Sequence, residues 1–148
     1  MATDRRADVT WQGSLLEGSG TITATTSGAI GEQHVSWPAR SEDATGGKTS
    51  PEELIAAAHA GCFTMALSAS LGRAGFTPKR LATQAAVTLE QVSGNWTISK
   101  VELETEAWIP QITPEKFQEI AADAKANCPV SRLLRAEITL HAKLEHIG

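Results

Sequence analysis

Residues 50–67 read SPEELIAAAHAGCFTMAL, and this stretch decides the fold. Ser50 is suited to cap a helix, Pro51 fits its first turn, and the two glutamates that follow favour the positive end of the helix dipole. The run from Leu54 to Arg73 is rich in alanine and apolar nearly all round. Such a helix is typically buried, either in a core or against another subunit. Gly75 is suited to end it.

Short alternating segments, which are typical of strands, lie on both sides of this helix. Before the helix they are residues 9–11, 20–25 and 34–37, followed by a polar loop at 40–49. After it, residues 86–89 and 96–108 predict a hairpin that turns at Ser93-Gly94-Asn95. The second strand of that hairpin alternates throughout, and its acidic face is expected to be exposed.

The last third of the chain predicts a second helix and a final strand. Thr113-Pro114-Glu115 starts the helix, which should end near Asn127 because Cys128 precedes a proline. A short turn at residues 131–134 and a strand at 136–144 follow. The order of strands, buried helix, strands, helix and strand indicates an α+β fold. A chain of 148 residues fits one domain, spanning residues 1–148.

Composition excludes several classes of protein. With 41% hydrophobic and 20% charged residues, the chain has the composition of a globular protein. Its net charge of -4 argues against a nucleic-acid partner. The apolar stretch from Leu54 to Leu67 is interrupted and too short to span a bilayer, and the N-terminus does not resemble a signal peptide. We therefore expect a cytoplasmic protein with no membrane partner.

Two cysteines are too few for a disulfide scaffold or a four-cysteine zinc site. His34, His141 and His146 have no metal-like spacing with each other or with the cysteines, so no metal site is predicted. Counting alone leaves open that both cysteines are buried, inert thiols.

Cys62 lies in the middle of the apolar helix, where burial raises the pKa of a thiol. A reactive Cys62 would therefore need a cation nearby, and Arg40 is a candidate because a guanidinium stays charged and carries five donors. Glu52 could orient Arg40 by a bidentate contact. The alternatives are a solvated Arg40, a Glu52 that only complements the helix dipole, and a His59 that only packs.

Helix geometry limits which chain supplies these groups. Glu52 and Cys62 are ten residues apart, about 15 Å along a straight helix, with an angular offset of roughly 280°. Glu52 should not reach Cys62 of its own chain unless the helix is broken. Either a break or a second subunit could bring the carboxylate and the thiol together, and the second route predicts a dimer with composite sites.

Cys128 follows the predicted second helix, 66 residues after Cys62. Closing that loop would favour the oxidised pair by roughly 4 kcal/mol in the loop-entropy description. Attack of Cys128 on a Cys62 sulfenic acid would form a disulfide and prevent further oxidation. Spacing alone does not establish that the two thiols meet.

Three segments together resemble the OsmC/Ohr family of organic hydroperoxide reductases. They are residues 50–67, Gly75-Phe76-Thr77-Pro78, and residues 126–131 (ANCPVS) followed by AEITL at 136–140. The similarity runs from Trp11 to Leu144, and the two cysteine motifs in this order are highly specific. Residues 38–41 resemble the OsmC branch, whereas the Ohr branch takes its arginine from nearer the N-terminus, where Arg5 and Arg6 stand here.

The resemblance implies a thiol peroxidase that reduces organic hydroperoxides and, more weakly, hydrogen peroxide. It implies antiparallel sheets wrapped around a long buried central helix in an intertwined homodimer. It makes Cys62 the peroxidatic cysteine, Cys128 the resolving cysteine, and Arg40 and Glu52 their catalytic partners. The implied reductant is a dithiol, such as a lipoylated protein, and no cofactor is implied.

Two other functions remain open from the sequence. The same scaffold could serve as a non-enzymatic thiol redox sensor or as a small-ligand binding protein, either of which lacks steady peroxide turnover. A purely structural dimer with inert thiols would react slowly with alkylating reagents at neutral pH.

Overall fold

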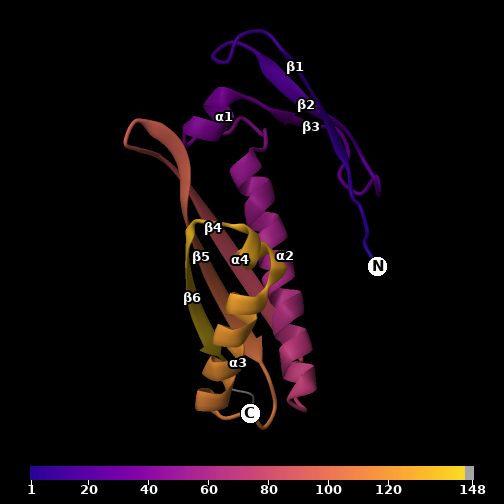
Figure 1. Ribbon diagram of the computed structural model, residues 1–148, viewed down its shortest axis with the longest axis vertical. Coiled ribbons are helices and arrows are strands. Elements are labelled where there is room, and N and C mark those ends of the chain that lie inside the picture. The colour runs from indigo at the N-terminus through magenta and orange to yellow at the C-terminus, as the bar shows by residue number, and fades with distance from the viewer. Residues whose placement is uncertain (146–148) are drawn as a thin grey trace. The chain divides into compact units, whose positions relative to one another are not determined.

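The computed structural model describes residues 1–145 and has an α+β fold with two small sheets and a long helix (Figure 1). The chain divides into two compact units, Met1–Leu54 and the residues from Ile55 onward. The division falls inside the long helix, so each unit is described by itself. One OsmC-like domain over residues 1–148 stays a prediction, and residues 146–148 lie outside the described part.

The first unit is a three-stranded antiparallel sheet with a short helix. The strands are β1 Ala7–Gln12, β2 Ser19–Thr25 and β3 Gln33–Val35, in the order β1-β2-β3. Helix α1, Trp37–Ser41, follows.

Helix α1 corrects two expectations, because Trp37 was assigned to a strand and Arg40 to a loop. Ser36 ends the extended segment, and its hydroxyl accepts from the Ala39 N–H at 3.2 Å. Pro38 lies in the first helical turn, where its missing N–H costs nothing. Arg40 is therefore held on a turn of helix, and the loop begins only after Ser41.

The second unit contains most of α2 (Pro51–Arg73), a second sheet and two further helices. Its strands are β4 Arg80–Val92, β5 Asn95–Trp108 and β6 Glu137–Leu144. Its other helices are α3 Pro114–Asn127 and α4 Pro129–Leu133. The sheet order is β4-β5-β6.

This second sheet is mixed, so the expectation of purely antiparallel sheets is wrong. Strands β4 and β5 form an antiparallel hairpin, whereas β5 and β6 are parallel. A parallel neighbour requires a crossover, and α3 and α4 supply it between β5 and β6.

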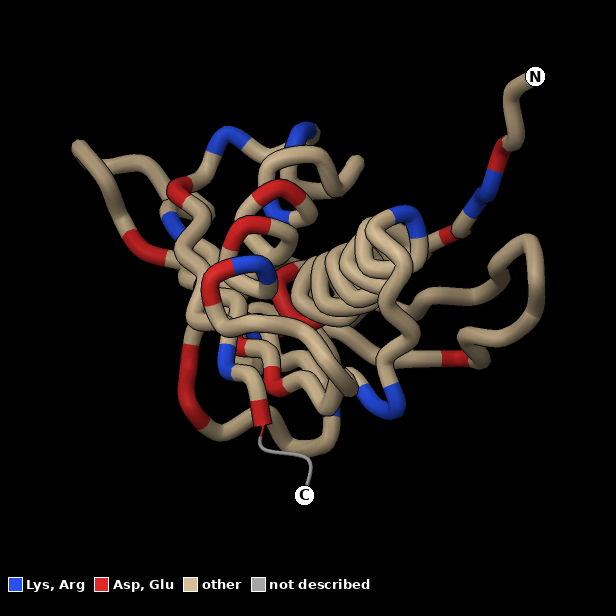
Figure 2. The backbone as a smooth tube through the Cα atoms, turned by 90° about the horizontal axis from the view of Figure 1, so that it is seen from below, with Lys and Arg blue, Asp and Glu red and all other residues tan. Residues whose placement is uncertain are grey.

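Helix α2 begins and ends as its sequence predicts. The Ser50 hydroxyl accepts from the Glu53 N–H at 3.1 Å. At the other end, the Phe76 N–H bonds to the Leu71 carbonyl at 2.9 Å and the Gly75 N–H to the Gly72 carbonyl at 3.0 Å. These two bonds form a Schellman motif around Gly75, whose φ is +90°. In Figure 2 the helix is tan along most of its length, because its charged residues lie near its ends.

One side of α2 forms the core of the second unit. Phe63, Leu67 and Leu71 are fully buried. They belong to a cluster that also contains Val101, Leu103, Ala107, Ile109, Phe117, Ile120, Ala121, Ala124 and Cys128. These contacts tie the helix to β5 and α3, so packing between elements stabilises the unit.

The other side of α2 is open within one chain, which differs from the expectation of a helix buried all round. Met65 is 75% exposed, and only 22% of the most apolar 18-residue window is buried. The helix is also long and apolar enough to cross a membrane by length and composition, contrary to the estimate from residues 54–67. Its packing of Phe63, Leu67 and Leu71 in the core accounts for part of that apolar character.

The β4–β5 hairpin turns at Ser93 and Gly94, both with positive φ (53° and 81°), as a two-residue turn of type I′ requires. A register shift lies where Thr88 pairs with Lys100 and Leu89 with Ile98. The extra residue interrupts the alternation predicted for residues 96–108. Beyond it the prediction is confirmed, since Val101, Leu103, Thr105 and Ala107 are buried while Glu104 and Glu106 are exposed.

Candidate active site

The two cysteines meet in the second unit. Cys62 lies on α2 and is partly exposed, and Cys128 caps the start of α4 and is fully buried. Neither is in a disulfide, and each side chain acts on the pKa of the other, so the two thiols are close neighbours. The fold therefore brings together two thiols that are 66 residues apart, which sequence spacing alone did not establish.

The environments of the two sulfurs push their pKa values in opposite directions. Burial, followed by the hydrogen bond with Cys128, raises the pKa of Cys62, and the Val130 amide lowers it only in part. Burial would also raise the pKa of Cys128, but hydrogen bonds from Cys62, Ser131 and the Val130 amide outweigh it and lower that pKa. Within one chain these directions favour a thiolate at Cys128 over one at Cys62, and because the two thiols interact the titration belongs to the pair.

A buried histidine stands behind this pair. His59 is fully buried on α2, and its Nε2 lies 2.8 Å from the Ser131 hydroxyl. Burial lowers the pKa of His59, so its imidazole is neutral near pH 7. Ser131 in turn contacts Cys128 through both its backbone N–H and its side chain.

Sequence reasoning missed Ser131 and left His59 as a packing residue. The sequence spacing offers one signal. Ser131 follows Cys128 by three residues, so the two side chains are neighbours on one face at the start of α4. The contact with His59 joins residues 72 apart in sequence, and a single sequence does not reveal it.

Arg40 and Glu52 form a pair in the first unit. The Arg40 Nε lies 2.9 and 3.2 Å from the two carboxylate oxygens of Glu52, and a terminal nitrogen of Arg40 lies 2.8 Å from Oε1. The Glu52 side chain is 9% exposed and that of Arg40 is 34% exposed. The guanidinium also stands over the Trp37 ring, 5.8 Å from its centroid. The predicted contact between Arg40 and Glu52 is thus present.

The two N-terminal arginines do not pair with Glu52 as Arg40 does. Arg6 pairs with Asp4 at 3.6 Å and Arg5 donates to the Asp4 carbonyl, and these three residues are exposed. Helix α2 has no break between Pro51 and Arg73, which removes one of the two routes considered for joining Glu52 to a thiol.

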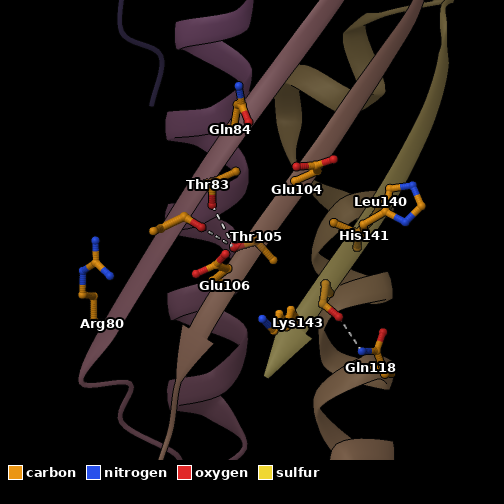
Figure 3. A pocket seen from close by; sticks show the side chains of 12 residues that line it. Arg80, Thr83, Gln84, Glu104, Thr105, Glu106, Gln118, Leu140, His141 and Lys143 are labelled. Atoms are coloured by element: carbon orange, nitrogen blue, oxygen red, sulfur yellow. Dashed lines mark hydrogen bonds between the residues drawn. The ribbon is translucent and has the colours of Figure 1, made fainter. Parts of the chain in front are cut away.

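The best-formed pocket lies elsewhere, on the β4–β5–β6 sheet, with a volume of about 640 Å³ (Figure 3). Charged residues from all three strands line it, including Arg80, Glu104, Glu106 and Lys143. None of the four predicted site residues lines it. The thiol pair is the candidate site, because it holds two potential nucleophiles, whereas no cysteine lines the pocket.

Within residues 1–145, no three or more His, Cys, Asp or Glu side chains gather closely enough to hold a metal ion. His146, which was considered at the sequence level, lies outside the described residues.

Comparisons with known proteins agree with the fold and with the family resemblance of the sequence. A model of the family described as OsmC-like protein matches residues 44–143. Peroxiredoxin OsmC of Escherichia coli (strain K12) is 43% identical over 145 residues, which cover 98% of this chain and 99% of that protein.

Among solved structures, the organic hydroperoxide resistance protein OhrB of Bacillus subtilis is 26% identical with a TM-score of 0.69. The match covers 95% of this chain and 98% of OhrB. An OsmC-like protein of unknown function from Vibrio cholerae, only 15% identical, shares the fold with a TM-score of 0.73 and covers 95% and 99% of the two chains. By its sequence, fold and family match, this chain belongs to the OsmC-like protein family.

Proposed function

We propose that this chain is a thiol peroxidase that reduces organic hydroperoxides to alcohols through Cys62 and Cys128. The observation that carries the proposal is that the fold brings these two free thiols close enough to act on each other's pKa. They lie in a chain that is 43% identical to a protein named peroxiredoxin. The similarity to an organic hydroperoxide resistance protein supports organic hydroperoxides as the substrate class.

In the first step, the Cys62 thiolate attacks the terminal oxygen of the hydroperoxide. The O–O bond breaks, the alkoxide leaves and takes up a proton to become the alcohol, and Cys62 becomes a sulfenic acid. Cys62 is partly exposed while Cys128 is buried, which favours Cys62 as the sulfur that meets the substrate.

In the second step, Cys128 attacks the sulfur of the sulfenic acid, water leaves, and a disulfide joins the two residues. A dithiol, such as a lipoylated protein, then restores both thiols by thiol–disulfide exchange. The cycle consumes one hydroperoxide and one dithiol, yields one alcohol and one water, and uses no cofactor.

The first step needs a cation beside Cys62, because burial raises the pKa of this thiol. We assign that role to Arg40, which Glu52 holds through both Nε and a terminal nitrogen. A guanidinium stabilises a thiolate and can donate to a peroxide oxygen. We propose that Arg40 and Glu52 of one subunit complete the thiol pair of the other, in a homodimer with composite active sites.

We also propose a cytoplasmic location, where reductants keep both thiols available. The net charge of -4 argues against a nucleic-acid partner. Helix α2 is proposed to serve as a core and interface helix, with no membrane partner.

Peroxide consumption by cysteine variants tests the function. With excess dithiol, Cys62→Ser should consume no cumene hydroperoxide, because the attacking sulfur is gone. Cys128→Ser should complete the first turnover and then continue much more slowly than wild type, because its sulfenic acid must react directly with the external dithiol. Steady turnover by Cys62→Ser would refute the proposal.

A second assay addresses the substrates. Rates with cumene hydroperoxide, tert-butyl hydroperoxide and hydrogen peroxide, each with lipoamide or a monothiol, should rank organic above inorganic peroxides and dithiol above monothiol. A faster reaction with hydrogen peroxide would refute the substrate class.

The proximity of the two thiols also fits a second candidate, a thiol redox sensor that forms the same disulfide without steady turnover. The two candidates differ in one measurement. An enzyme continues to consume peroxide while dithiol is in excess, whereas a sensor stops after one equivalent.

A further inference from the structure

Two buried polar side chains, His59 and Ser131, lie next to Cys128 and form a hydrogen-bond line that the mechanism above does not use. The Nε2 of His59 on α2 lies 2.8 Å from the Ser131 hydroxyl. Ser131 lies in the first turn of α4, three residues after the N-cap residue Cys128, and its hydroxyl lowers the pKa of that thiol. His59 is 0% exposed and Ser131 is 9% exposed. Burying a histidine and a serine among apolar residues costs free energy unless both are hydrogen-bonded. Their position next to Cys128 therefore suggests a functional role.

A thiolate carries no proton, so the Ser131 hydroxyl can only donate to Cys128 in its anionic form, in agreement with the lowered pKa of Cys128. The serine oxygen is then free to accept, and a neutral imidazole can donate from Nε2. This leaves Nδ1 of His59 as an acceptor, and among residues 1–145 that buried atom has no hydrogen-bond partner. The opposite tautomer would leave an unpaired buried N–H, which is the rarer arrangement.

We propose that Ser131 is a catalytic residue of the disulfide-forming step and that His59 positions it. The His59 Nε2–H donates to Ser131, and the Ser131 hydroxyl donates to Cys128, which it holds as the thiolate that attacks oxidised Cys62. This inference rests on the proposed peroxidase function and adds two residues to it.

The proton and electron balance fits a pair that shares one negative charge. After Cys62 attacks the hydroperoxide, the alkoxide takes the proton that Cys128 held, which leaves Cys128 as the thiolate. The lone pair of Cys128 forms the S–S bond, the S–O bond of the sulfenic acid breaks, and the departing hydroxide takes a proton from solvent to become water. His59 stays neutral throughout and donates only a hydrogen bond.

The titratable groups that face Cys128 are few. Cys62 faces it directly, and His59 acts through Ser131, both from α2. The Val130 and Ser131 amides contribute from α4. The core cluster that surrounds Cys128 presents apolar side chains from β5 and α3. A change at Ser131 should therefore appear directly in the pH dependence of Cys128.

A peroxide-free assay tests the inference separately from the proposed function. Cys62 is loaded as a mixed disulfide with thionitrobenzoate, and attack by Cys128 releases the coloured thiolate as the internal disulfide forms. Ser131→Ala should slow this release roughly tenfold at pH 7 and move the rate–pH profile to higher pH, because it removes a hydrogen bond to a charged atom. Ser131→Thr, which keeps the hydroxyl, should restore most of the rate.

His59 variants identify what the imidazole supplies. His59→Gln places an amide N–H near the position of Nε2 and should stay close to the wild-type rate, whereas His59→Phe should resemble Ser131→Ala. If Ser131→Ala does not fold, the comparison of His59→Gln with His59→Phe still tests the inference. Thr105→Val is the matched control, since Thr105 is buried in the same unit and bonds to Thr83 and Ala82 on β4.

Equal rates and equal pH profiles for wild type, Ser131→Ala and His59→Phe would overturn the inference. A wild-type protein that releases the coloured thiolate normally but does not consume hydroperoxide would refute the peroxidase function and leave the hydrogen-bond line intact. The two failures are therefore distinguishable.

Discussion

Cys62 and Cys128 each influence the pKa of the other, so their titration belongs to the pair. Hydrogen bonds to Cys128 from Ser131 and the α4 amides favour the charge on the buried sulfur. The peroxide step needs the charge on the other sulfur, and a cation beside Cys62 would move it there at little cost. This opposition suits a two-step cycle, because each sulfur must be the thiolate once.

Arg40 contacts Glu52 through two nitrogens at once, which a lysine cannot do. Arg40→Lys keeps the charge but loses the simultaneous contacts of Nε and a terminal nitrogen with Glu52. We expect kcat/KM for cumene hydroperoxide to fall by about tenfold, because a charge-assisted hydrogen bond contributes on the order of 1.5–3 kcal/mol. Steady-state kinetics with excess dithiol measures it.

Arg80→Lys is the matched control for that experiment. Arg80 also stands over a tryptophan, 4.5 Å from the Trp108 centroid, but lies outside the proposed site. Its variant should keep kcat/KM within about twofold of wild type. If Arg40→Lys were as active as Arg80→Lys, Arg40 would have no role in the chemistry.

Sequence reasoning could identify the residues whose chemistry depends on local context. Their neighbours in the sequence singled out Cys62 in an apolar helix and Cys128 before a proline as candidates, and the predicted Arg40–Glu52 contact is present. Ser131 was missed because its role depends on contacts with Cys128 and with His59 that only the folded chain creates.

At the scale of elements, the end of α2 depends on one glycine. Gly75 has φ +90°, and a Cβ built there would meet nothing within 4 Å. Gly75→Ala should therefore lower the free energy of unfolding by about 1–2 kcal/mol through backbone strain alone. Urea unfolding followed by circular dichroism measures the change.

Gly72, three residues earlier, provides the opposite case. It lies inside α2, and a Cβ there would also meet nothing within 4 Å. Gly72→Ala should raise the free energy of unfolding by up to about 1 kcal/mol, because alanine is the better helix former. Equal effects of the two substitutions would contradict this account of how the helix ends.

Elements with strong local signals were predicted well, and those set by long-range pairing were not. Helix α2, α3 and the β4–β5 hairpin follow from caps, proline and turn residues. Ser36 and Pro38 are also helix-start residues, but the predicted strand was extended to Trp37, which is the first residue of α1. The parallel pairing of β6 with β5 depends on a crossover, which alternation within a strand does not encode.

At the scale of the whole molecule, the exposed side of α2 is the surface that bears on assembly. A single chain exposes Met65 and leaves most of the apolar window of this helix accessible. Contiguous apolar surface of this kind marks an interaction site. A second copy of the chain is the occupant that would also bring another Arg40–Glu52 pair, which the proposed mechanism requires.

The purified protein should therefore form a dimer with twice the 15.7 kDa mass of one chain, as measured by size-exclusion chromatography with light scattering. Met65→Lys should weaken the dimer, because a charge would be buried without a partner, and peroxide turnover should fall in parallel as composite sites are lost. Ala122→Lys, on an exposed position of α3, should change neither. Full turnover by a monomeric Met65→Lys protein would mean that one chain completes its own site, and the composite arrangement would have to be abandoned.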